Sequence, residues 1–147
     1  MEARILERDS EIAELLVGVR RIAVLGMKTE AQAGQPAFYV PEYLARVGYD
    51  IVPVPVYYPE VTSILGRKVY RRVAEVPGGV DLVDVFRRSR DLAPHLDDLI
   101  AARPRAVWLQ SGIRDDAFAA RLVEAGISVV QDECLMVEVR HRGLRPR

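Results

Sequence analysis

Three short segments of the chain carry residue types that suit an anionic ligand. The first follows an apolar run and reads Gly26-Met27-Lys28. A glycine at this point lets backbone N–H groups approach a phosphate closely, and a lysine adds positive charge. By spacing alone this is a weak phosphate motif, because neither the G-x-G-x-x-G fingerprint nor the Walker ending Gly-Lys-Ser/Thr is present.

The other two segments also follow apolar runs. Arg87 and Arg88 follow the run 80–86, and arginines bind phosphate through planar, charge-assisted hydrogen bonds, although a solvated turn is an equal alternative. The segment 110–112 offers neutral polar groups. Ser111 is not in a nucleophile elbow, because Leu109 stands where that motif requires glycine. We therefore interpret Ser111 as a binding residue at most.

The residues that most often perform catalysis are isolated in this sequence. Cys134 is the single cysteine, so it forms no internal disulfide, and its neighbours Asp132 and Glu133 do not favour a thiolate. His95 and His141 are far apart in the chain and are interpreted as surface residues. We expect no metal site and no catalytic constellation, which makes an enzyme the less favoured class.

Alternating strands and helices must position these segments. The apolar patterns predict a leading helix after Asp9, five strands, and helices between the later strands; Pro41 is expected in the first turn of the helix near 38–47, and another short helix follows Cys134. The strands are predicted at 21–26, 49–56, 80–86, 106–110 and 127–131. This alternation predicts an α/β, Rossmann-like three-layer domain with a five-stranded parallel sheet, order 3-2-1-4-5. Its ligand site is expected at the carboxyl ends of the strands, between the first and the fourth.

Composition limits the class of protein. The chain has 147 residues, half of them hydrophobic, with 21 basic and 21 acidic side chains. We predict one domain over 1–147, with a core at about 21–138, a leading helix within 1–20 and a basic tail at 139–147. The charge balance argues against nucleic acid or membrane as partners, and no run is long enough to span a bilayer. A cytoplasmic location is expected.

The end of the second strand discriminates between nucleotides. A site for NAD usually places an acid there to bind the ribose, but this end reads "VPVPVYY", and Asp50 lies at the opposite end of the strand. The sequence therefore argues against NAD. It leaves room for a nucleotide whose ribose carries a phosphate or faces an apolar wall.

From about Arg21 to Glu138 the chain resembles the small stand-alone CoA-binding domain proteins. These are similar to the N-terminal domain of the succinyl-CoA synthetase alpha subunit. The resemblance rests on six segments in order: "IAVLG", "GYDIVPV", "ILGRKVYRRVAEVP", "VDLVDVFRR", "AVWLQSG" and "VVQDECLMVE". Two departures are Gly-Met-Lys with a longer insertion in place of the common Gly-Ala-Ser, and Glu133 where a basic residue often precedes the cysteine.

The resemblance implies a Rossmann-like domain that binds coenzyme A or an acyl-CoA. Carried over by position, the implied contacts run along the ligand from the phosphates (Gly26, Met27 and Lys28) to the nucleoside (Pro53 and Val54, with Phe86 and Arg87 in the same region), the pantetheine arm (Gln110, Ser111 and Gly112) and the thiol end (Cys134). The synthetase domain that carries a phosphorylated histidine has no counterpart in this chain. A non-catalytic carrier, sensor or regulatory module is therefore expected.

Alternatives remain at this point. The same crevice could serve an NADP-dependent oxidoreductase or another nucleotide-using enzyme, since an arginine pair can accept a 2′-phosphate. The module could instead only mediate protein contacts. A redox-linked version of the leading hypothesis is that Cys134 forms a mixed disulfide with the CoA thiol. A protein partner and the oligomeric state are left open.

Overall fold

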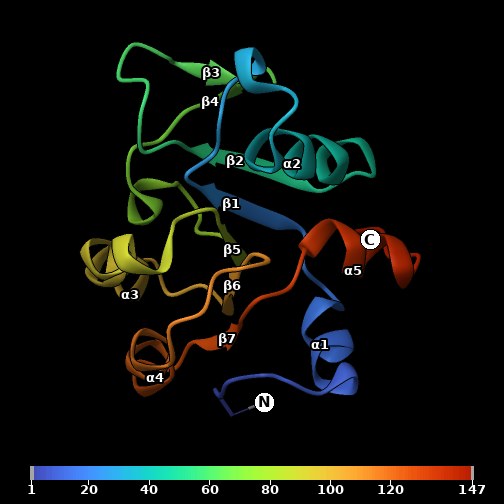
Figure 1. The fold of residues 1–147 in the computed structure, drawn as a ribbon. Coiled ribbons are helices and arrows are strands. Elements are labelled where there is room, and N and C mark those ends of the chain that lie inside the picture. The colour runs from blue at the N-terminus through green and yellow to red at the C-terminus, as the bar shows by residue number, and fades with distance from the viewer. Residues whose placement is uncertain (1, 147) are drawn as a thin grey trace.

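The apolar runs form a parallel sheet of five strands between two layers of helices. The computed structural model describes residues 2–146. Its sheet contains β1 (Arg21–Leu25), β2 (Asp50–Val54), β5 (Leu82–Val85), β6 (Ala106–Leu109) and β7 (Ser128–Val130). The helices α1 (Asp9–Leu16), α2 (Pro36–Arg46) and α5 (Leu135–His141) lie on one face, and α3 (Leu96–Ala102) and α4 (Asp116–Glu124) lie on the other, as Figure 1 shows.

The strands are buried on both faces, which explains their continuous apolar sequence. In β5, for example, Leu82 packs into the cluster beneath α1, α2 and α5, whereas Val83 and Val85 pack into the cluster beneath α3 and α4. The predicted Rossmann-like class and its five parallel strands are confirmed.

The order of the strands requires one correction. The sheet runs β2-β1-β5-β6-β7, and an extended segment ending at Tyr70 adds to the outer edge of β2, where its N–H donates to the carbonyl of Pro53 at 3.0 Å. When this segment is counted as third, the order becomes 3-2-1-4-5-6, which contains the predicted order 3-2-1-4-5 and adds β7 at the far edge. The assignment of the run 80–86 as the third strand was wrong, because β5 pairs with both β1 and β6. A buried strand at the edge of the sheet would leave a row of its N–H and C=O groups unpaired, which its place between β1 and β6 avoids.

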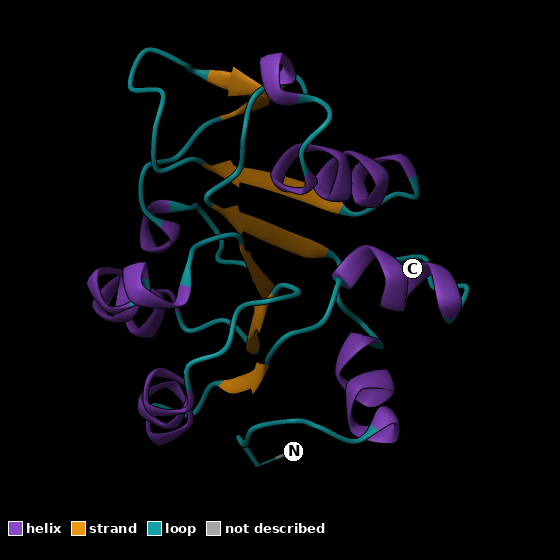
Figure 2. Cartoon of the chain, in the orientation of Figure 1, coloured by secondary structure: helices purple, strands orange, loops and turns teal. Residues whose placement is uncertain are grey.

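The topological switch point therefore lies between β1 and β5, not between β1 and the strand at 106–110. The chain adds β2 on one side of β1 and β5 on the other, so the loops after β1 and β5 run to opposite sides and leave a crevice between them. The long connection between β2 and β5 contains the hairpin of β3 (Ser63–Ile64) and β4 (Arg67–Lys68) and the turn η2 (Val73–Glu75), visible as the loop-rich region of Figure 2.

Helix α2 begins earlier than the sequence predicts. Pro36 is its first residue, so Pro41 lies inside the helix and not in its first turn. A proline there cannot donate to the carbonyl four residues before it, that of Ala37. The Lys28 N–H takes this carbonyl instead, at 3.1 Å. Because Pro41 has no N–H, the Ala37 carbonyl is free to accept from Lys28, and this bond holds the loop after β1 against α2.

The helix predicted between the strands at 80–86 and 106–110 is shorter in the structure. The stretch around Pro94 forms two short turns, η3 (Ser89–Asp91) and η4 (Ala93–His95), before α3 begins at Leu96. The last helix, α5, begins directly after Cys134 as expected. At the other end of the chain, Ile5 forms a parallel bridge with Val129 of β7, so the residues before α1 extend the edge of the sheet.

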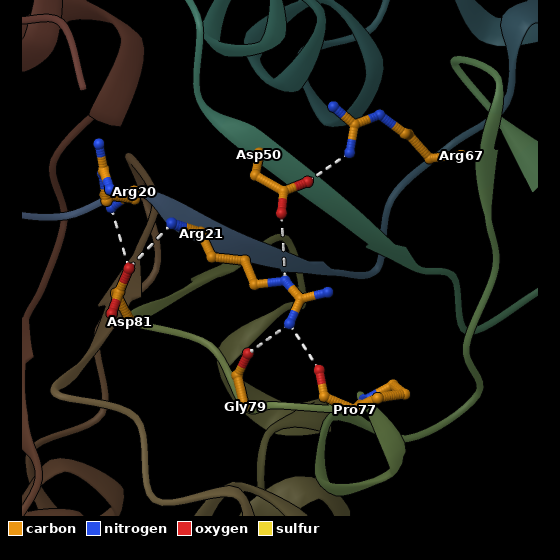
Figure 3. A network of polar contacts seen from close by, with 7 residues as sticks. All are labelled: Arg20, Arg21, Asp50, Arg67, Pro77, Gly79 and Asp81. Atoms are coloured by element: carbon orange, nitrogen blue, oxygen red, sulfur yellow. Dashed lines mark hydrogen bonds and ion pairs between the residues drawn. The ribbon is translucent and has the colours of Figure 1, made fainter. Parts of the chain in front are cut away.

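Charged groups close the amino-terminal edge of the sheet (Figure 3). One carboxylate oxygen of Asp81 accepts from the backbone N–H groups of Arg20 and Arg21, both at 2.9 Å. The Arg21 guanidinium donates to the carbonyls of Pro77 and Gly79, and its Nε lies 3.2 Å from Asp50. These contacts hold the entry to β5 against β1. They leave the opposite, carboxyl edge free to carry a site.

Within residues 2–146 no helix is long and apolar enough to cross a membrane.

Candidate functional site

A cavity of about 510 Å³ opens at the carboxyl edge of the sheet, at the switch point. Four separate stretches build its wall: the loop after β1 with the start of α2, the loop after β5, the loop after β6, and the residue before α5. The lining residues are Lys28, Gln35, Pro36, Ala37, Tyr39, Val40, Phe86, Arg87, Arg88, Ser89, Gln110, Ser111, Gly112, Ile113 and Cys134. The site predicted from the sequence and this cavity therefore share most of their loops.

Gly26 sets the spacing between the two loops at the switch point. Its φ is +85°, a conformation that favours glycine, and its N–H donates to the Val54 carbonyl at 2.9 Å. A Cβ at this position would lie 2.4 Å from the carbonyl oxygen of Phe86. The strand ends of β1 and β5 can approach each other this closely only because position 26 has no side chain.

Lys28 leads from this turn into the cavity wall. Its backbone is fixed to Ala37 as described above, and its Nζ donates to the side-chain oxygen of Gln35. This acceptor is neutral, so the positive charge of the lysine is not cancelled. The ammonium group is therefore held at the mouth of the cavity with its charge available to an anion.

Arg87 follows β5 and extends across the crevice. Its Nε donates to His95 Nε2 at 3.2 Å, and a longer contact of 3.4 Å joins its guanidinium to the hydroxyl of Tyr57. Burial and the nearby Arg87 charge lower the pKa of His95 below its ordinary value. The sequence interpretation of His95 as an isolated surface residue was wrong, because the fold brings it to within hydrogen-bonding distance of a cavity residue.

Gln110 and Cys134 lie together at the far side of the cavity. Gln110 is 4% exposed, and its side-chain oxygen accepts from the Leu135 N–H at 2.9 Å. The ring N–H of Trp108 donates to the Glu133 carbonyl at 2.8 Å. These two bonds fix the residues on either side of Cys134 to β6, so the half-buried thiol has a defined place in the wall.

The loop after β6 offers a ligand fewer free hydrogen-bonding groups than its sequence suggests. The Gly112 N–H is already used, since it donates to the carboxylate of Asp132 at 2.6 Å. Ser111 is exposed and stands at the rim.

Four residues that the resemblance assigned to the site do not line the cavity: Gly26, Met27, Pro53 and Val54. Met27 is 1% exposed and packs in the core, and Pro53 and Val54 are buried, with their carbonyls bonded to Tyr70 and Gly26. The side chains that sequence reasoning did not assign come mainly from the start of α2. The signal for them was Pro36, a residue common at the first helical position.

The lining combines apolar surface with positive charge. Lys28, Arg87 and Arg88 all line the cavity, whereas none of its lining residues in the described part of the chain is an acid. In a chain whose formal net charge is zero, this is a local concentration of positive charge. Such a wall suits a ligand that has both anionic groups and an uncharged, partly apolar portion.

Among residues 2–146, no three His, Cys, Asp or Glu side chains lie close enough together to hold a metal ion.

The comparisons with known proteins found a family model, a curated relative and similar solved structures. A family model described as a CoA binding domain matches residues 20–140. The curated protein YneT of Bacillus subtilis, which is uncharacterised, is 30% identical over 128 residues, covering 87% of this chain and 91% of its own. Among solved structures, the protein ID.343 from Thermus thermophilus is 40% identical with a TM-score of 0.82, covering 92% of this chain and 98% of the other.

A more distant structure shows the same fold within a larger enzyme. A dinucleotide-forming acetyl-coenzyme A synthetase of Ca. Korarchaeum cryptofilum is 20% identical with a TM-score of 0.68, and the match covers 79% of this chain and 26% of that one.

Proposed function

This chain belongs to the CoA-binding domain family, and we propose on that premise that its cavity binds coenzyme A or an acyl-CoA. The observation that carries the proposal is the wall with three cations and no acid among its lining residues, at the switch point of the sheet. The phosphates of CoA suit the cationic side formed by Lys28 and Arg87. The uncharged pantetheine arm suits the side formed by Val40, Phe86 and Ile113.

The site residues proposed for this ligand follow the geometry of the cavity. Gly26 supplies the close turn, Lys28 and Arg87 the charge, and Gln110, Ser111, Gly112 and Cys134 the region of the arm and its thiol. Met27, Pro53 and Val54 are given no ligand contact in this proposal, since they are buried and do not line the cavity. We propose that the protein acts as a carrier, a sensor or a regulatory module that presents the ligand to a partner.

A thermal-shift panel tests the ligand. CoA and acetyl-CoA are expected to raise the melting temperature, because a ligand that binds only the native state adds about 2.7 kcal/mol of stability at a hundred times its Kd. NAD is expected to have no effect, since no acid follows β2. Stabilisation by NADP and not by CoA would overturn the proposal in favour of a nucleotide-dependent enzyme, and the absence of any response would favour a module for protein contacts.

Cys134 gives a second, covalent test of the same placement. Its thiolate can attack oxidised CoA, forming a protein–CoA disulfide while the S–S bond of the reagent breaks and one CoA thiol leaves. Because Cys134 lines the cavity, incubation with oxidised CoA is expected to give a reducible mass increase of one CoA. Intact-mass spectrometry before and after reduction measures it, with Cys134→Ser as the control. No adduct on the native protein would contradict the placement of the thiol end.

A further inference from the structure

Arg87 crosses the crevice at the place where the strand order reverses. It begins after β5, passes over Gly26 at the end of β1, and ends at Tyr57, beyond β2. Its Cδ lies 3.3 Å from where a Cβ of Gly26 would stand. The stem of the arginine thus occupies the space that a side chain at position 26 would fill, and the guanidinium is carried toward the loop after β2.

Two neutral groups hold this guanidinium. His95 Nε2 accepts from Nε at 3.2 Å, and the Tyr57 hydroxyl lies 3.4 Å from a terminal nitrogen. The guanidinium carbon also lies 5.6 Å from the centre of the Tyr57 ring, within the range of a cation–π contact. Since Nε always carries a hydrogen, His95 must accept at Nε2 and carry its own proton on Nδ1.

Carboxylates hold several of the other arginines. Arg21 lies against Asp50, Arg72 against Asp98, and Arg142 between Asp9 and Glu138. In those pairs the positive charge is largely neutralised. A neutral acceptor fixes the direction of the guanidinium and leaves its charge uncompensated, which is the arrangement a site for an incoming anion needs.

The surroundings of His95 favour the neutral ring. Burial, followed by the charge of Arg87, lowers its pKa, while Asp98 and Asp91 act in the opposite direction. Asp98 is also occupied elsewhere: its two oxygens accept from the N–H groups of Val73 and Ala74, and Arg72 lies 3.8 Å away. His95 is therefore an acceptor at neutral pH.

We propose that His95 and Tyr57 are positioning residues that hold Arg87 ready for a phosphate group of the ligand. The proposal rests on CoA as the ligand. It adds that the Arg87 guanidinium is already oriented before the ligand binds. Preorganisation matters because an arginine that is already ordered loses less side-chain entropy when it binds. The phosphate can belong to the pyrophosphate or to the 3′-phosphate of CoA, since both offer the same acceptor oxygens.

Calorimetric titration of the native protein and of variants with CoA tests this. His95→Leu removes the acceptor and is expected to weaken CoA binding about tenfold, corresponding to one charged hydrogen bond. His95→Gln places a neutral oxygen near the position of Nε2 and is expected to restore affinity to within about threefold of native. The matched control is His141→Leu, which removes the other histidine, exposed at the end of α5, and should bind as the native protein does.

Two further arms separate positioning from a general structural effect. Binding of pantetheine, which has no phosphate, should be the same in native and His95→Leu proteins. In an Arg87→Ala background, His95→Leu should cause no further loss, because the two residues act through one contact. Loss of affinity for dephospho-CoA as well as CoA would assign the contact to the pyrophosphate, and loss for CoA alone would assign it to the 3′-phosphate; both results support the proposal.

The outcomes distinguish this inference from the function it rests on. If the native protein binds no CoA, the proposed function fails and the positioning role fails with it. If the native protein binds CoA and His95→Leu binds equally well, only the positioning role is wrong. Equal losses for pantetheine and CoA, or additive losses in the double variant, would also overturn it, and thermal melts of each variant show whether the fold is retained.

Discussion

Replacing Gly26 with alanine is expected to lower the free energy of unfolding by about 3 kcal/mol and to abolish CoA binding at micromolar ligand. Two costs add. A residue with a side chain is strained at a φ of +85°, and the new Cβ would lie 2.4 Å from the Phe86 carbonyl oxygen. This neighbour is backbone directly after β5, and the Phe86 N–H is bonded to the Leu25 carbonyl at 2.9 Å, so it cannot rotate away freely. Relief requires the ends of β1 and β5 to separate.

Binding should be lost with stability because the same two strand ends carry the cations of the cavity. Lys28 follows Gly26 by two residues, and Arg87 follows Phe86 directly. Separating the strands would move both away from the positions that face the ligand. Urea unfolding measures the first effect, and titration with CoA below the unfolding transition measures the second.

Gly34→Ala is the matched control for this experiment. Gly34 belongs to the same stretch between β1 and α2, and a Cβ built there meets nothing within 4 Å. Its substitution should leave stability and CoA binding close to native. An unfolding free energy for Gly26→Ala as high as that of Gly34→Ala would show that the strand ends adapt and that the proposed constraint is wrong.

Replacing Asp84 with asparagine is expected to make the protein more stable at neutral pH and to flatten its stability profile. Asp84 lies in the middle of β5, between Val24 of β1 and Trp108 of β6. It is fully buried, and neither carboxylate oxygen has a hydrogen-bond partner within residues 2–146. Burial without a partner raises the pKa of Asp84 well above its ordinary value.

The direction of the pH effect follows from proton linkage. In the unfolded chain the carboxyl loses its proton near its ordinary pKa of about 3.9, whereas the folded protein keeps the proton to higher pH. Above about pH 3.9 the unfolded state therefore binds fewer protons, and this group makes stability fall as pH rises, by up to about 1.4 kcal/mol for each pH unit. The loss stops when the pH passes the raised pKa of the folded state.

Asparagine resembles the protonated carboxyl in size and cannot ionise. Asp84→Asn should therefore match native stability near pH 4 and exceed it by a margin that increases with pH until the raised pKa of Asp84 is passed, as measured by urea unfolding between about pH 4 and pH 8. Asp97→Asn, on the exposed side of α3, is the control and should follow the native profile. Parallel native and Asp84→Asn profiles would show that Asp84 is ionised or solvated in the folded protein.

Local signals were sufficient for much of the fold. Short apolar runs predict the five buried strands, because each strand of a covered parallel sheet must be apolar on both faces. A glycine at the end of the first run indicates a tight turn, and the lack of an acid after the second argues against NAD. The order of six segments indicates the CoA-binding family, which the match over residues 20–140 confirms.

Properties that depend on distant residues were predicted incompletely. The sequence does not show which neighbour satisfies the second edge of β5, so that strand was numbered third although it lies between β1 and β6. The place of Pro41 in the helix depends on Lys28, which supplies a donor from another loop. Met27 was assigned to the site, but its side chain is buried in the core, because direction at a turn is set by packing.

The sequence by itself therefore determined the class of the fold and the family of the chain, since apolar runs and the order of short segments are read along the chain without knowledge of its tertiary contacts. Only the tertiary structure decided how the site is built. It places Arg87 over Gly26 and between His95 and Tyr57. Gly26, Tyr57 and His95 lie on three different connections of the sheet. It also leaves Asp84 alone inside an apolar core. The environment of an arginine and the protonation of a buried acid depend on the groups that surround them in space, and the course of the chain between those groups is set by tertiary packing.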